Sequence, residues 1–203
     1  MSSTKERILR TALRLFARSG FEAVSVSDIA KELGVTKGAL YKHYASKRDI
    51  FASIVARMEV RDAEQANAHG LPDAPMQGAE DAYRDASIND LTAFGKTMFR
   101  YWTQDEFAAC FRRMLTLEQF RNTEMETLYQ QYLASGPLDY ITDLLDANHI
   151  PQPRKEASAF YAPMFLLYSI YDAARDKTEV VALADELLER AREHLMQIKG
   201  KDN

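Results

Sequence analysis

The chain has 203 residues, a single cysteine and a net charge of −4, and 46% of its residues are hydrophobic. This length allows a buried core in one or two domains, and a lone cysteine excludes an intramolecular disulfide framework and fits a reducing cytoplasm. The longest largely apolar run, 162–171, is far shorter than the roughly 20 residues of a membrane helix, and no basic-then-apolar leader opens the chain. We therefore expect a cytoplasmic protein that contacts no membrane.

Charge is divided unevenly along the chain. Residues 1–50 contain ten basic and five acidic residues and carry +5, whereas the remainder contains 16 basic and 25 acidic residues and carries −9. A basic head on an acidic body is typical of a protein whose first segment faces nucleic acid.

The first predicted helix begins after Ser3, where Ser3-x-x-Glu6 has the spacing of a capping box, and ends at Gly20. Its arginines are predicted to form a solvated face, either in free solvent or near phosphates. Its apolar residues recur at helical spacing and predict a buried face of Ile8, Leu9, Ala12, Leu13 and Phe16.

Two short helices follow, separated by a tight turn. Ser25-x-x-Asp28 predicts the start of the first, and Gly34 its end, because glycine adopts the left-handed conformation without a side-chain penalty. Thr36 is placed to cap the next helix, in which Leu40 and Tyr44 have the spacing of a buried pair. The residues opposite that pair are small or carry polar tips, which suits a helix that enters a DNA groove.

The run from Thr4 to Ile54, centred on TALRLFARSGFEAVSVSDIAKELGVTKGALYKHYASKRDIF, resembles the amino-terminal domain of the TetR/AcrR transcriptional regulators. The resemblance implies a helix-turn-helix DNA-binding domain over residues 1–47 and a helical ligand-binding and dimerisation domain over residues 48–203. It implies a position in or beside the major groove for Thr36, Lys37, Gly38, Lys42 and His43. It implies phosphate contacts for Ser25, Tyr41 and Lys47. Tyr44, where many members have phenylalanine, is a mild departure from the pattern.

An all-α fold is predicted for the whole chain. Ser46-x-x-Asp49 predicts the start of a long helix that continues to about His69, and the segment Gly70–Pro75 breaks it. Further helices are predicted at about 88–103, 106–120, 123–134, 137–147, 156–173 and 179–199.

The resemblance also implies an inducer pocket in the body. Aromatic and methionine side chains offer adaptable apolar surface for a hydrophobic or aromatic ligand, although the same residues also suit an ordinary core. The candidates are Met98, Trp102, Phe111, Met114, Tyr129, Phe165, Tyr168 and Tyr171. Pro163 predicts either a helix kink that turns the Ala159 carbonyl toward a cavity or an irregular helix start.

The last helix has an apolar face that requires a partner surface, which is either its own domain or a second subunit. With the preceding helix it resembles the family's paired dimerisation helices. We expect a homodimer through these two helices, bound to a palindromic operator in double-stranded DNA, because paired heads recognise two related half-sites. The expected function is a repressor switched by an unknown small-molecule effector, with no cofactor and no metal.

Two alternatives stay open. An enzyme that processes small molecules is one, although the sequence contains no nucleophile elbow, no phosphate-binding glycine loop and no metal-binding motif. A redox-responsive regulator acting through Cys110 is the other, although a lone thiol among aromatic residues is more often buried filler.

Overall fold

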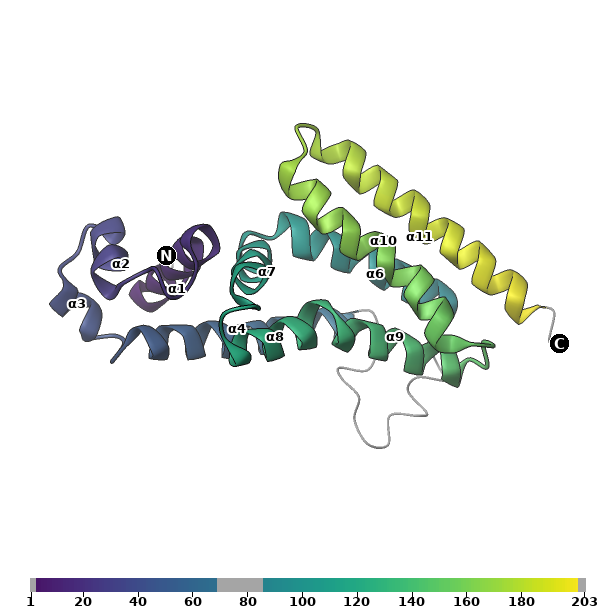
Figure 1. Cartoon of the computed structure of the whole chain (residues 1–203), viewed down its shortest axis with the longest axis horizontal. Helices are drawn as coiled ribbons and strands as arrows, with labels where there is room; N and C mark the ends of the chain where they lie inside the picture. Colours follow the sequence, from purple (N-terminus) through teal and green to yellow (C-terminus); the bar gives the residue numbers. More distant parts are fainter. Residues whose placement is uncertain (1–2, 69–85, 201–203) are drawn as a thin grey trace. The chain divides into compact units, whose positions relative to one another are not determined.

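The computed structural model describes residues 3–68 and 86–200 (Figure 1). These residues form ten helices and no strand, so the predicted all-α fold is confirmed. The predicted break at Gly70–Pro75 lies outside the described residues. None of the described helices has the length and apolar composition needed to cross a bilayer.

The helices divide into two compact units. Unit 1 contains residues 1–61 and 106–129, and unit 2 contains residues 62–105 and 130–203. This spatial division places residues 106–129 with the amino-terminal helices, whereas the predicted functional boundary after residue 47 separates them. That functional boundary remains a prediction.

Unit 1 begins with α1 (Thr4–Ser19), α2 (Val26–Leu33) and α3 (Lys37–Tyr41), followed by the first part of α4 (Lys47–Ala68). It also contains α7 (Glu106–Glu118) and the first part of α8 (Thr123–Leu133). α1 packs against both α2 and α7. The core includes three aromatic rings in series, since the centroids of Phe16 and Phe21, and of Phe21 and Phe51, are each 5.1 Å apart.

Unit 2 contains α6 (Ile88–Gln104), α9 (Ser135–Ala147), α10 (Pro153–Ala173) and α11 (Lys177–Lys199). α10 packs against α6, α9 and α11, and α11 also packs against α6. The rings of Phe99 on α6 and Tyr168 on α10 stack at 5.5 Å. At the edge of the same packing, Arg100 of α6 forms two hydrogen bonds with the Asp185 carboxylate of α11. Aromatic stacking therefore joins α6 to α10, and charge pairing joins α6 to α11.

Three of the predicted helix starts differ from the structure, and one alternative for Pro163 is wrong. α9 begins at Ser135, α10 at Pro153 and α11 at Lys177, each before its predicted start. Pro153 lies in the first turn of α10, where the backbone amide that proline lacks would have no helical partner. Pro163 therefore lies in the helix interior and does not mark a helix start, and Ala159 lies on the exposed side of α10.

Candidate nucleic-acid interface

The turn between α2 and α3 is fixed by local hydrogen bonds. The Ser25 hydroxyl accepts from the Asp28 amide, and the Asp28 carboxylate accepts from the Ser25 amide at 2.8 Å, which completes the predicted capping box. These bonds lower the pKa of the Asp28 carboxyl, with the Ser25 hydroxyl as the largest cause. Gly34 has φ +69°, the left-handed conformation predicted from its position.

α3 is oriented by its buried side. The Thr36 hydroxyl caps the helix by accepting from the Ala39 amide at 3.1 Å. Leu40 and Tyr44 are both buried, as predicted, and burial raises the pKa of the Tyr44 hydroxyl, with the nearby carboxylates of Asp49 and Glu6 adding to the shift. α3 ends at Tyr41, so Tyr44 lies after the helix and not, as predicted, within it. Because Leu40 is buried, the opposite side of α3 must face outward.

That outward side carries most of the predicted DNA-contacting residues. Five of them are exposed and His43 is half-buried, and a Cβ atom added at Gly38 would meet nothing within 4 Å. The Lys37 ammonium lies 5.8 Å from the centre of the Tyr41 ring. In and around α3 the structure thus leaves exposed Thr36, Lys37, Gly38, Tyr41 and Lys42, with His43 half-buried.

The remaining two predicted residues lie at helix starts and have partners within the protein. Ser25 is exposed, but its hydroxyl also donates to the Asp28 carboxylate at 2.6 Å. Lys47, at the start of α4, donates to the backbone carbonyls of Phe21 and Glu22 at 2.7 and 3.3 Å, and its ammonium lies 4.3 Å from the Phe21 ring centre. Lys47 therefore holds the α1–α2 loop in this structure, and a phosphate contact would compete with those carbonyls.

Arg48 is a further exposed cation beside Lys47 that the sequence reasoning did not single out. Its guanidinium pairs with the Glu124 carboxylate of α8 at 2.5 Å. The sequence offered no signal for this pair, because the two residues are far apart in the chain and no local pattern connects them.

The predicted ligand residues are divided between the units. Phe111, Met114 and Tyr129 are buried in unit 1. In unit 2, Trp102, Tyr168 and Tyr171 are buried, Met98 is half-buried and Phe165 is 42% exposed. None of these eight residues lines the cavity between α1, α2 and α4. Cys110, the redox candidate, is buried in α7. Among the described residues, no group of three or more His, Cys, Asp or Glu side chains is placed to hold a metal ion.

Comparison with known proteins supports the assignment of the head. Residues 8–54 match the family described as "Bacterial regulatory proteins, tetR family". The chain is 47% identical over 53 residues to the transcriptional regulator YerO of Bacillus subtilis and 47% identical over 51 residues to the transcriptional regulator AcrR of Shigella flexneri. These matches cover 26% and 25% of this chain but only 18% and 24% of the two relatives.

Solved structures extend the likeness of fold to almost the whole chain. A TetR/AcrR-family regulator from Aquifex aeolicus matches with a TM-score of 0.64 at 17% identity, covering 97% of this chain and 99% of the other. SmeT, the repressor of a multidrug efflux pump of Stenotrophomonas maltophilia, matches in its complex with triclosan with a TM-score of 0.60 at 20% identity, covering 94% and 90%.

Proposed function

Because the chain belongs to the TetR/AcrR family of bacterial regulatory proteins, we propose that it is a sequence-specific repressor that binds an approximately palindromic operator as a homodimer. The observation that carries this proposal is the exposed surface of α3 and of the turn that follows it. Small Gly38 lies there near hydroxyl, imidazole and ammonium groups, and buried Leu40 fixes the rotation of the helix. Small residues let the helix backbone approach base edges, and the flanking groups reach phosphates.

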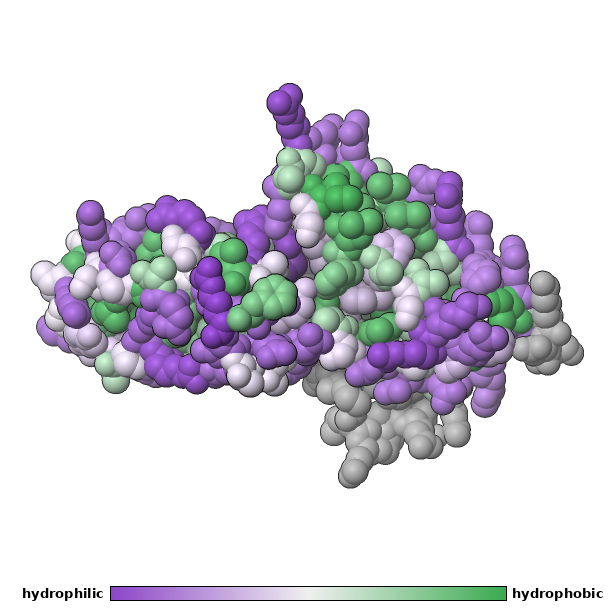
Figure 2. Space-filling model, in the orientation of Figure 1, coloured by the Kyte–Doolittle hydropathy of each residue, from purple (hydrophilic) through white to green (hydrophobic). Residues whose placement is uncertain are grey.

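The proposed dimer interface is the exposed side of α10 together with α11. Between Ala157 and Tyr171, α10 contains no charged residue. Large apolar side chains lie exposed on it, including Leu166 at 61%, and on α11, including Leu183 and Met196. Figure 2 shows hydrophobic residues gathered over α10. Exposed apolar residues gathered on a helix mark an interaction site, and a two-fold dimer would cover them with its own copy.

The proposed effector is a small hydrophobic or aromatic molecule bound in the helical body. SmeT is similar in fold and forms a complex with triclosan, an observation made on SmeT that supports the same ligand class here. The aromatic residues Trp102, Tyr168 and Tyr171 are buried in unit 2, so a ligand that contacts them must displace neighbouring side chains. A ligand shifts DNA affinity only by its preference between two protein conformations, commonly about 1–3 kcal/mol of coupling.

The experiment is selection of tightly bound duplexes from a random DNA pool, followed by titration of the recovered sequence at several salt concentrations. We expect an inverted repeat whose affinity falls steeply with salt. Lys42→Gln should reduce the salt slope by roughly 1.8 if this ammonium neutralises one phosphate in each subunit of the dimer. Arg175→Gln makes the same change of charge at an exposed residue of unit 2 and should leave the slope unchanged. Failure to enrich any sequence would contradict the proposal.

A further inference from the structure

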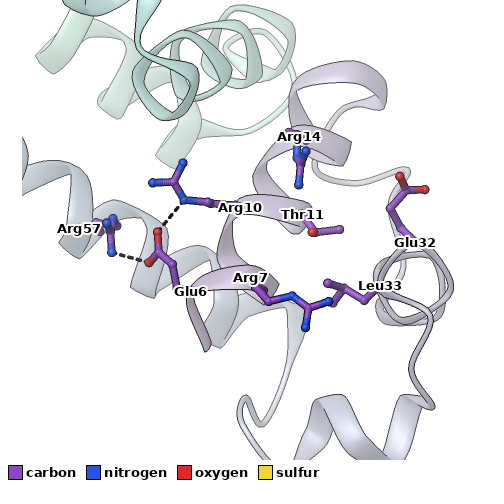
Figure 3. Close-up of a pocket in the computed structure, with 8 residues that line it drawn as sticks. All are labelled: Glu6, Arg7, Arg10, Thr11, Arg14, Glu32, Leu33 and Arg57. Atoms are coloured by element: carbon purple, nitrogen blue, oxygen red, sulfur yellow. Dashed lines mark hydrogen bonds and ion pairs between the residues drawn. The ribbon is translucent and has the colours of Figure 1, made fainter. Parts of the chain in front are cut away.

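Unit 1 contains a cavity of about 600 Å³ between α1, α2 and α4 (Figure 3). Its α2 and α4 walls contribute Glu32, Leu33 and Arg57. The wall from α1 is a single helix face with residues at i, i+1, i+4, i+5 and i+8, namely Glu6, Arg7, Arg10, Thr11 and Arg14. None of these eight residues belongs to the predicted DNA-contacting set. A volume of this size is in the range of small-molecule sites.

The lining is cationic. Four arginines and two glutamates line the cavity, which gives the lining a net charge of +2 at neutral pH. One carboxylate is already shared, because Glu6 accepts from Arg10 Nε at 2.7 Å and from Arg57 Nη1 at 2.5 Å. Glu6 therefore fixes two of the guanidinium groups in place and has little capacity left to neutralise the other two.

Two arginines have unused donors. The Arg7 guanidinium has no hydrogen-bond or ion-pair partner among the residues that the structure describes, and the Arg14 guanidinium only approaches Glu106 at 3.6 Å, beyond hydrogen-bond distance. In Figure 3 these two side chains lie on either side of Thr11. Arg57 Nε is in addition buried without a hydrogen-bond partner, and an unpaired buried donor requires an explanation such as an absent ion or water.

We propose that this cavity binds a compact anion of the diphosphate class, a small molecule with two adjacent phosphate groups. Guanidinium groups bind phosphate oxygens through paired hydrogen bonds. Arg7 and Arg14 are two helical turns apart, about 10 Å along the axis, so their side chains approach a two-group anion from opposite ends.

Occupation of this site would connect the three helices that form its walls. α1 supports α2, whose end determines the turn before α3. A bound anion would therefore stabilise unit 1 directly. The binding claim is independent of the proposed operator recognition, because it concerns residues outside the α3 surface and is tested without DNA.

The test is calorimetric titration of the full chain with inorganic pyrophosphate at physiological ionic strength. We expect saturable binding with one site per chain, weaker binding of orthophosphate, and an increase in the thermal unfolding temperature with pyrophosphate. Arg7→Gln and Arg14→Gln should each weaken pyrophosphate binding by about tenfold or more, since each removes charged hydrogen bonds. Arg7 makes no ion pair, so its loss should leave folding intact.

Arg18→Gln is the matched control, because Arg18 is exposed on the same helix and does not line the cavity. It should bind pyrophosphate as the unaltered protein does. Absence of pyrophosphate binding would overturn the proposal, and so would an equal loss in all three variants, which would indicate general charge attraction. If pyrophosphate does not bind but Arg7→Gln and Arg14→Gln weaken duplex binding more than Arg18→Gln does, these arginines hold DNA phosphates and the small-anion site is wrong.

Discussion

A substitution at Gly38 tests the proposed DNA contact without destabilising the fold. A methyl group added at Gly38 would have no protein atom to contact within 4 Å. Alanine also favours the helical conformation over glycine by up to about 1 kcal/mol. We expect Gly38→Ala to leave the unfolding temperature unchanged or raised. If the backbone of α3 approaches base edges closely, the methyl group displaces contacts worth about 1–3 kcal/mol, so operator affinity should fall roughly 5-fold to 150-fold.

The measurement is a titration of the selected operator together with thermal unfolding. Gly200→Ala, at the end of α11, makes the same chemical change in unit 2 and should leave operator affinity unchanged. Unaltered operator binding by Gly38→Ala would mean that α3 does not approach the bases at this residue.

Lys47 has contacts that the sequence around it does not predict. The family resemblance implies a phosphate contact for Lys47, and that role remains a proposal. The structure shows partners that no local pattern indicates, because the Phe21 and Glu22 carbonyls reach Lys47 Nζ only once the α1–α2 loop has folded back. Spacing predicts which residues share a helix face, but it does not predict which distant backbone groups satisfy a side chain.

At the scale of helices, local chemistry predicted the starts and ends well. The Ser25 and Thr36 caps and the Gly34 stop depend on hydrogen bonds between residues at most five apart, and each is found as expected. The membership of α7 in unit 1 depends instead on packing between α1 and residues about a hundred positions later. Phe111 and Met114 therefore belong to unit 1, as does Tyr129, whereas the other five ligand candidates belong to unit 2. Periodicity alone does not reveal this division.

The α2 capping box gives a prediction for acid. Hydrogen bonds in the folded protein lower the pKa of Asp28 below its ordinary value of 3.8. A lowered folded-state pKa means that the stabilisation is present above the unfolded-state value and is lost as pH falls through the folded-state value. Asp28→Asn keeps an oxygen acceptor but does not titrate there. The variant should be less stable than the unaltered protein at pH 7, and the difference should shrink as pH falls below about 4.

The measurement is thermal unfolding followed by circular dichroism over that pH range. Glu22→Gln removes an exposed carboxylate just before α2 and serves as the control for a simple change of net charge. A stability difference between Asp28→Asn and the unaltered protein that stays constant from neutral to acidic pH would contradict a role for the Asp28 charge.

For the whole molecule, the segment of α10 without charged residues decides whether two DNA-binding domains act together in a dimer. Leu166 is 61% exposed in the single chain, so Leu166→Glu should leave the fold of the chain intact. In a two-fold dimer the same substitution appears on both copies and buries carboxylates in an apolar interface. Burying an unpaired charge costs several kcal/mol, so the dimer dissociation constant should rise by about 100-fold or more.

Sedimentation equilibrium measures this change against a chain mass of 23.1 kDa. Val60→Glu, at a residue 59% exposed on α4, introduces the same charge away from the proposed interface and should remain dimeric. A Leu166→Glu protein that stays dimeric would place the interface elsewhere. A monomeric unaltered protein would remove the reason for an inverted repeat, because one head contacts one half-site, and the operator selected from random DNA should then be a single half-site.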